Sequence, residues 1–372
     1  MREYLLICVV AMTITYLSTP LARAVAVIVK AVTPLRDRDV HRVPIPRLGG
    51  VALLLGFAAA TLVARQLPFL KGVYSSGQMT GVLLGAAIIC LVGALDDIRE
   101  LDWITKLAGQ ILAAGVMAYK GVVLLQVPFF GTSTVLPGPV LTLVTVLIVL
   151  VTVNAVNWID GLDGLAAGIV AIASFAFFVY CYVVSQSYNP PNVFSTATFV
   201  TAATLGACLG FLPHNFNPAR LFMGDSGALL LGLLLAAATI SLTGNVDPNA
   251  VSGDATTAAL LPIAAPLAVL SLPFVDMVVA ILRRARAGQK PWQADGKHLH
   301  HKMLHIGHGH RAAVLILYLW AALVAFGTVA FAFFPPQQTL AALAAAACIA
   351  ALLTAFLPTL TRARSRPSDE GL

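Results

Sequence analysis

Charged side chains are scarce in this chain of 372 residues: only 10% of the residues are Asp, Glu, Lys or Arg, and 59% are hydrophobic. Soluble domains carry about 25% charged residues, so this composition excludes a soluble domain. A membrane-spanning helix needs roughly 20 mostly apolar residues, and the hydrophobic stretches predict an all-α polytopic integral membrane protein with about 11 transmembrane helices. The predicted spans are residues 4–29, 48–66, 79–95, 104–120, 138–153, 164–184, 196–212, 227–243, 257–282, 312–334 and 338–360.

The sequence also lacks cysteines at paired spacing and the net positive charge that precedes the apolar segment of a signal peptide. The five cysteines all lie inside predicted spans without paired spacing, so we expect small buried side chains and no disulfide framework. Arg2 and Glu3 leave no net positive charge before the first apolar segment, which favours a span over a cleaved leader. Residues 1–372 are predicted to form a single membrane-embedded domain, with a cytoplasmic basic, His-rich loop at 283–311 and a cytoplasmic tail at 361–372.

The few positive charges are distributed unevenly. One set of alternate loops holds 18 of the 23 Lys and Arg residues, and the opposite set holds four. The positive-inside rule then predicts an external N-terminus and a cytoplasmic C-terminus. This basic cytoplasmic face suits anionic lipid headgroups and phosphorylated substrates, although topology alone also accounts for it.

Two adjacent carboxylates, Asp96 and Asp97, end the third predicted span. Adjacent carboxylates repel each other, so one pKa should rise unless a cation lies between them. A raised carboxylate can act as a general base, and a shared cation would make a metal site. The alternative is ordinary solvation at a helix end, with Arg99 or Lys106 as an ion-pair partner.

A polar stretch between two long apolar spans contains Asn154, Asn157, Asp160 and Asp163, each three residues from the next. On a helix, residues at this spacing share a face. Polar groups beside a bilayer are costly to keep, so the stretch predicts ligand binding.

The segment Phe222-Met223-Gly224-Asp225-Ser226-Gly227 precedes the eighth predicted span. We expect Asp225 near the N-terminus of that helix, where backbone amides favour anions. Mg²⁺ typically takes one or two carboxylates plus substrate phosphate oxygens, so Asp225 suits a cation that carries a pyrophosphate. A simple helix cap is the alternative. Phe222 can stack on a nucleobase or pack internally.

Six histidines crowd the loop at 283–311. A zinc site usually includes Cys or carboxylate ligands, and no Cys is near, which disfavours zinc. We expect the first three, His298, His300 and His301, to contact phosphate or to be structural. Asp276 lies inside the ninth span, where a carboxylate is either functional or holds a neighbouring Arg.

Taken together, these segments resemble the polyprenyl-phosphate N-acetylhexosamine-1-phosphate transferase family (glycosyltransferase family 4) over roughly residues 4–312. One branch of this family transfers phospho-N-acetylmuramoyl-pentapeptide and typically carries three consecutive His and a Pro-Thr-Met-Gly-Gly-like motif. This chain has His-Leu-His-His and Pro-Arg-Leu-Gly-Gly, and its eleventh span also resembles the N-acetylglucosamine-1-phosphate transferase branch. The motifs are Pro46-Arg47-Leu48-Gly49-Gly50, Asp96-Asp97 with Lys106-Leu107-Ala108-Gly109-Gln110, 154–168, 215–227, and Ala294-Asp295 with His298-Leu299-His300-His301.

The resemblance implies that N-acetylglucosamine 1-phosphate passes from UDP-N-acetylglucosamine to a polyprenyl (undecaprenyl or decaprenyl) phosphate. UMP would leave in this first step of a cell-envelope glycan, at the cytoplasmic face of the plasma membrane. Another N-acetylhexosamine donor, including the muramoyl-pentapeptide, is the alternative within the enzyme class. A secondary transporter is a distant one, because the polar residues gather on one face and show no repeat-related broken helices.

The resemblance also implies roles for single residues. Asp96 or Asp97 would activate the lipid phosphate, or one of them would be a covalent nucleophile. The implied metal is Mg²⁺ on Asp225, with Mn²⁺ as a substitute. The expected partners are UDP-N-acetylglucosamine, the polyprenyl phosphate lipid and the membrane, without nucleic acid, and a homodimer is left open. The implied nucleotide-binding residues are Asn154, Asn157, Asp160, Asp163 and Phe222, and the implied phosphate-binding residues are Arg47, Lys106, His298, His300 and His301.

Overall fold

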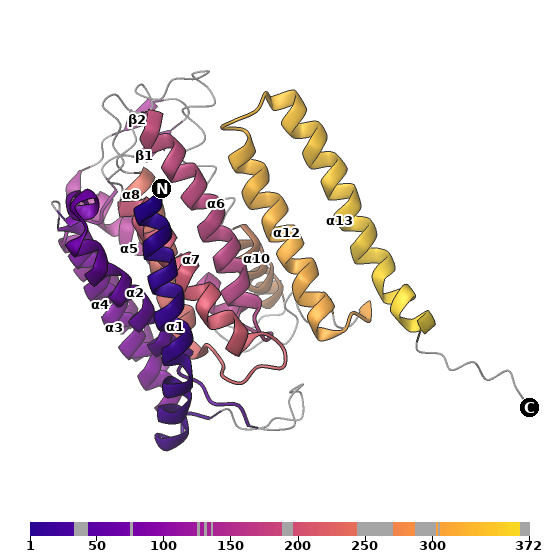
Figure 1. Cartoon of the computed structure of the whole chain (residues 1–372), viewed down its shortest axis with the longest axis horizontal. Coiled ribbons are helices and arrows are strands. Elements are labelled where there is room, and N and C mark those ends of the chain that lie inside the picture. The colour runs from indigo at the N-terminus through magenta and orange to yellow at the C-terminus, as the bar shows by residue number, and fades with distance from the viewer. Residues whose placement is uncertain are drawn as a thin grey trace, which may run out of the picture.

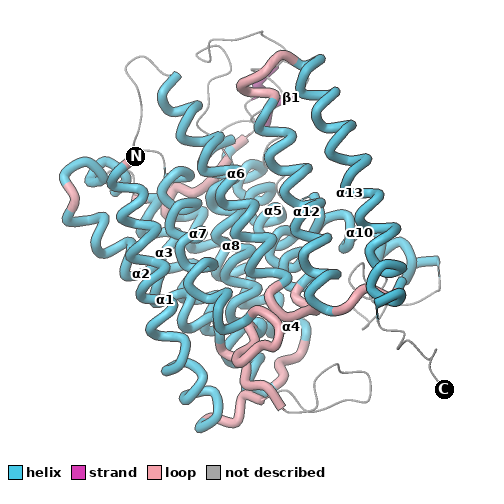
Figure 2. Tube along the Cα trace, turned by 45° about the vertical axis from the view of Figure 1, so that its right-hand side comes forward, coloured by secondary structure: helices cyan, strands magenta, loops and turns pink. Residues whose placement is uncertain are grey.

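A computed structural model describes residues 1–32, 44–74, 77–124, 127–129, 132–134, 137–187, 196–243, 271–286, 303 and 306–364. The described chain is almost entirely helical (Figures 1 and 2). Its elements are α1 (Arg2–Ile28), α2 (Gly49–Gln66), the 3₁₀ helix η1 (Pro68–Tyr74), α3 (Gln78–Arg99), α4 (Trp103–Tyr119), β1 (Val127–Phe129), β2 (Thr132–Thr134), α5 (Gly138–Ile159), α6 (Leu165–Ser187), α7 (Thr196–Asn215), α8 (Gly224–Thr243), α10 (Ser271–Arg286), α12 (His310–Ala330) and α13 (Pro336–Arg364).

Nine helices among these residues are long and apolar enough to cross a membrane: α1, α2, α3, α5, α6, α7, α8, α12 and α13. The polytopic helical architecture is thereby confirmed, whereas eleven spans and an external N-terminus stay predictions. The predicted span 104–120 forms α4, which has only 17 residues. Most of the predicted span 257–282 lies outside the described residues, and α10 is the part that is seen. The antiparallel hairpin of β1 and β2 was not predicted.

Helix α8 forms the centre of the bundle. In its most apolar stretch of 18 residues, 89% of the residues are buried. It packs against α2, α3, α5, α6 and α7. Its sequence from Gly227 to Ala238 is apolar on every side, and a helix of that kind is stable only when other helices surround it. The N-terminus of α8 is therefore held at a fixed place among the ends of its neighbours.

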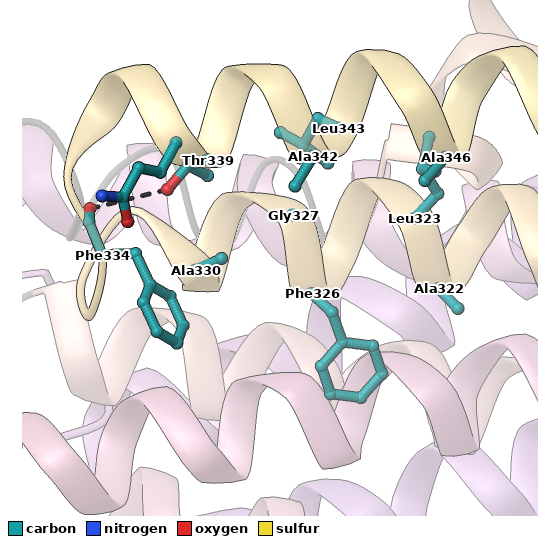
Figure 3. Close-up of a pocket in the computed structure, with 11 residues that line it drawn as sticks. Ala322, Leu323, Phe326, Gly327, Ala330, Phe334, Thr339, Ala342, Leu343 and Ala346 are labelled. Carbon is teal, nitrogen blue, oxygen red and sulfur yellow. Dashed lines mark hydrogen bonds between the residues drawn. The ribbon is translucent and has the colours of Figure 1, made fainter.

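Helices α12 and α13 form the outer edge of the bundle (Figure 1). In the most apolar 18-residue stretch of α13, only 11% of the residues are buried, and α13 packs mainly on α12. An open apolar groove of about 510 Å³ lies between the two helices and is lined in part by Phe326, Phe334 and Leu343 (Figure 3). Exposed apolar residues such as Leu352 suit contact with lipid.

Several helices continue beyond the predicted ends of their apolar runs. The predicted spans ended at residues 95, 153 and 212, whereas α3, α5 and α7 continue to Arg99, Ile159 and Asn215. Asp97, Asn157 and Asn215 in these last turns form hydrogen bonds with residues far away in the chain, so the helical backbone is kept. The polar clusters therefore lie on helix ends and not in free loops.

Asp160 and Asp163 do not share a helical face. Helix α5 ends at Ile159, Asp160 is its C-cap residue, and Asp163 lies in the turn before α6. The glycines in this turn, at 161 and 164, break the helix, and Gly164 has a φ of +80° that other residues rarely adopt. The expectation of a helical face was correct only for Asn154 and Asn157, which both lie on α5.

Candidate active site

Asp225 lies at the point where the ends of α3, α4, α5 and α8 meet. Its Oδ2 atom contacts the Nζ atom of Lys106, which is also 3.2 Å from Oδ2 of Asp96. Its Oδ1 atom accepts a hydrogen bond of 3.0 Å from Nδ2 of Asn157. The structure thus brings together four residues that the sequence had singled out, each from a different helix.

Asp97 caps the N-terminus of α8. Its Oδ1 atom accepts a hydrogen bond of 2.9 Å from the backbone N–H of Asp225, and its Oδ2 atom accepts one of 3.1 Å from Ser226. The first N–H groups of a helix lack partners within the helix, and a carboxylate satisfies both their hydrogen bonding and the helix dipole. Asp97 is buried, so these bonds are shielded from water. The catalytic role of Asp97 stays a prediction, and its contacts are those of a helix cap.

Residues 46–50 form a backbone junction with the start of α8. Phe222 donates its N–H to the carbonyl oxygen of Pro46 at 2.9 Å, and Gly49 donates to the carbonyl oxygen of Phe222 at 3.1 Å. Gly50 continues the junction by donating to the carbonyl oxygen of Met223 at 3.2 Å. The early Pro-Arg-Leu-Gly-Gly motif is therefore part of the same site as Asp225.

The carboxyl group of Asp160 has an unusually high pKa. Burial raises its pKa to about 7, and the neighbouring carboxylates of Asp97 and Asp163 act in the same direction. The positive charge of Arg47 opposes them. At neutral pH this side chain can therefore both donate and accept a hydrogen bond, which suits recognition of a polar ligand.

Asp163 holds the loop between α7 and α8. Its Oδ2 atom accepts hydrogen bonds from Nδ2 of Asn217 at 2.9 Å and from the backbone N–H of Ala219 at 3.0 Å. Its own backbone N–H donates to Nε2 of His310 at 3.1 Å. Since this loop leads into Phe222, Asp163 helps to hold the backbone that precedes that residue. The nucleotide-binding role predicted for Asp163 and Phe222 is not tested by these contacts.

We expect Asp163→Ala to lower the free energy of unfolding by about 1–3 kcal/mol, because it leaves two hydrogen-bond donors without their acceptor. Asn217→Ala should cost less, and the double variant should be little worse than Asp163→Ala, since both changes remove the same bond. Thermal unfolding of the purified variants in detergent measures these effects. Strictly additive losses would contradict the proposed contact between the two side chains.

Asn154 pairs with Gln110 across α4 and α5. Nδ2 of Asn154 donates to Oε1 of Gln110 at 2.8 Å, and Gln110 is buried. Gln110 lies one turn after Lys106 on α4, and Asn154 lies about one turn before Asn157 on α5. The amide pair therefore keeps Lys106 and Asn157 turned toward the same place. The predicted nucleotide contact of Asn154 stays a prediction.

Arg284 and Trp158 make a contact that the sequence did not predict. The guanidinium carbon of Arg284, on α10, lies 4.7 Å from the centre of the Trp158 ring, and Arg284 is buried. This cation–π contact fixes α10 against the end of α5, next to Asn157. The signal available in the sequence was an aromatic residue inside a stretch rich in Asn and Asp.

The predicted phosphate-binding residues His298, His300 and His301 lie outside the described residues. Within the described ranges, no group of three or more His, Cys, Asp or Glu side chains is placed to hold a metal ion. A cation at Asp225 would therefore need ligands beyond the described carboxylates, for which phosphate oxygens are suited.

Comparison with known proteins places these observations in a family. Residues 79–243, which include the four helix ends around Asp225, match the family model of Glycosyl transferase family 4. The chain is 41% identical over 367 residues to a decaprenyl-phosphate N-acetylglucosaminephosphotransferase of Mycolicibacterium smegmatis, covering 97% of this chain and 90% of that protein. It is 33% identical over 318 residues to a probable undecaprenyl-phosphate N-acetylglucosaminyl 1-phosphate transferase of Bacillus subtilis, covering 84% and 80%. A phospho-N-acetylmuramoyl-pentapeptide-transferase of Desulforudis audaxviator is 38% identical over 226 residues, covering 55% and 64%.

Proposed function

Because this chain belongs to glycosyl transferase family 4, in its N-acetylglucosamine-1-phosphate transferase branch, we propose that it acts on UDP-N-acetylglucosamine and a polyprenyl phosphate. It transfers N-acetylglucosamine 1-phosphate to the lipid and releases UMP. Relatives named for N-acetylglucosamine match over most of the chain, whereas the muramoyl-pentapeptide relative matches 55% of it. This difference favours N-acetylglucosamine as the donor sugar. Decaprenyl phosphate is favoured as the acceptor because the decaprenyl-phosphate relative is 41% identical and the undecaprenyl-phosphate relative 33%.

The observation that carries the proposal is the convergence of Lys106, Asp96 and Asn157 on Asp225 at the N-terminus of α8. Both substrates are anionic, and the pyrophosphate gains negative charge as the bond to UMP breaks. A helix N-terminus, an ammonium group and a carboxylate-bound cation are the groups that stabilise such charge. A transporter would require a polar pathway across the bundle, and the described polar cluster lies at one end of it.

A divalent cation, Mg²⁺ or Mn²⁺, fits this donor set. The carboxylates of Asp225 and Asp96 approach the same ammonium group, and the amide of Asn157 offers an oxygen once it is reversed. One or two carboxylates completed by phosphate oxygens are the usual Mg²⁺ ligands. When bound, the cation supplies Lewis acidity and neutralises charge on the pyrophosphate.

The other steps of the transfer are assigned to side chains of this chain. Asp96 or Asp97 takes the proton of the lipid phosphate, a modest task because the second pKa of a phosphate monoester is about 6. The freed phosphate oxygen attacks the β-phosphorus of the donor, and the bond from that phosphorus to the oxygen bridging to UMP breaks. Lys106 and Arg47 neutralise phosphate oxygens, and Asp160 and Phe222 face the nucleotide. His298, His300 and His301 keep their predicted place on the phosphates.

The site is proposed to face the cytoplasm. The loops on the side of Asp96 and Asp225 carry 18 of the 23 positive charges, which is the distribution expected of cytoplasmic loops. UDP-sugars are cytosolic and the acceptor lies in lipid, so both can meet only at this interface.

Incubation of the purified protein with decaprenyl phosphate, Mg²⁺ and UDP-N-acetylglucosamine tests the function. We expect UMP and a pyrophosphoryl lipid to form with this donor, and neither to form with UDP-N-acetylmuramoyl-pentapeptide. Turnover of only the pentapeptide donor would overturn the assignment of the sugar. In a parallel sample without lipid, stoichiometric UMP release would indicate a covalent intermediate on a carboxylate, whereas no release favours direct attack.

A further inference from the structure

The ammonium group of Lys106 lies between two carboxylates that are both turned toward it. One oxygen of each carboxylate is already occupied: Oδ1 of Asp96 accepts the N–H of Leu101 at 2.8 Å, and Oδ1 of Asp225 accepts from Asn157 at 3.0 Å. The remaining Oδ2 atoms both contact Nζ of Lys106. Two oxygens from α3 and α8 are thus held around one positive charge.

This arrangement is partly shielded from water. The side chains of Lys106, Asp96 and Asp225 are 21%, 16% and 26% exposed, so the charges interact more strongly than they would on an open surface. The three residues come from α4, α3 and α8, whose ends are fixed by the Asp97 cap and the Gln110–Asn154 pair. The carboxylates therefore cannot separate easily to make room for a second cation.

We propose that Lys106 and the divalent cation alternate at these two Oδ2 atoms. This inference rests on the proposed function, because it takes the cation at Asp225 to be the one used in the transfer. A divalent cation and an ammonium group repel each other, so binding of the cation displaces Lys106. The flexible four-carbon stem of Lys106 lets the displaced ammonium turn to a phosphate of the donor.

The exchange gives Lys106 two successive tasks. It neutralises the Asp96–Asp225 pair while no metal is bound, and it becomes a phosphate ligand once the metal has taken its place. The cation must compete with Lys106, so its apparent affinity for the free protein is lower than the carboxylates alone would give. A phosphate that holds the displaced ammonium strengthens metal binding, and by linkage the metal strengthens phosphate binding.

Direct measurement of Mn²⁺ binding tests the exchange. The full-length protein in detergent, without substrates, is titrated with Mn²⁺, and free Mn²⁺ is followed by electron paramagnetic resonance. We expect Lys106→Met to lower the Kd for Mn²⁺ at least about tenfold, because the competing charge is gone. Lys106→Arg keeps the charge and should bind Mn²⁺ about as weakly as the wild type. Arg99→Gln removes an exposed charge near the pair and should change the Kd by less than about twofold.

A second measurement guards against a variant that is merely unstable. Without metal, Lys106→Met leaves two carboxylates facing each other, so Mn²⁺ should raise its thermal unfolding midpoint more than that of the wild type. An unchanged or weaker Kd in Lys106→Met, together with UMP release by the wild type, would overturn the exchange and leave the proposed function standing. Absence of UMP release by the wild type would overturn the proposed function itself.

Discussion

Asp225→Asn is expected to lower kcat for UMP release by at least about 10³-fold while the protein remains folded. The amide has nearly the same shape as the carboxylate, and the hydrogen bonds from the backbone of Asp225 and Ser226 to Asp97 do not involve the changed group. The charge that would hold the cation is removed, and Lys106 loses one of its two partners. Initial rates over a range of Mg²⁺ concentrations measure the effect, and activity should not recover at high Mg²⁺.

Asp102→Asn is the matched control for this change. Asp102 is the exposed N-cap residue of α4, where its side chain accepts from the N–H groups of Ile104 and Thr105. Asn is an equally good cap, so the same loss of charge should leave both stability and turnover near those of the wild type. Near-normal turnover by Asp225→Asn would refute the assignment of Asp225 as the metal ligand.

Gly50→Ala is expected to have the second largest effect, a loss of folded protein or of at least about 100-fold in turnover. A Cβ atom at this position would lie 2.2 Å from the carbonyl carbon of Ser226 and 2.3 Å from the backbone nitrogen of Gly227. These are backbone atoms of α8, so they cannot rotate away. Relief of the overlap would move the N-terminus of α8, and Asp225 with it.

Gly115→Ala provides the control for the added methyl group. Gly115 lies within α4, and a Cβ atom there would meet nothing within 4 Å. Replacement of Gly by Ala inside a helix is favourable by about 0.5–1 kcal/mol, so this variant should be at least as stable as the wild type. Fluorescence-detected size exclusion after heating compares the two. Wild-type stability and turnover in Gly50→Ala would show that the close contact between Gly50 and the backbone of α8 is not required.

The sequence predicted the position of Asp225 well, because a local pattern determines it. Gly224 and the apolar run that starts at residue 227 place a carboxylate in the first turn of a helix, and α8 begins at Gly224. The helical nature of the other segments followed in the same way from hydrophobic runs. Local patterns of this kind are the part of a structure that a single sequence specifies.

The contacts of Asp97 and Lys106 could not be predicted in this way. Asp97 lies 128 residues from the amide that it caps, and Lys106 lies 119 residues from Asp225. Such pairs depend on how the helices pack, which hydrophobic periodicity does not specify. The ends of α3 and α5 were placed too early for a related reason: side-chain partners in other helices keep their polar last turns helical.

The junction between residues 46–50 and the start of α8 has a consequence for the design of chimaeric enzymes. The loop from Asn215 to Asp225 is an attractive unit for exchange between relatives that use different sugars. The backbone of this loop, however, is hydrogen-bonded to the backbone of Gly49 and Gly50. A transplanted loop would pack against a segment 46–50 whose shape matches the original loop and not the new one. Such a graft should carry both segments together, although they are far apart in the chain.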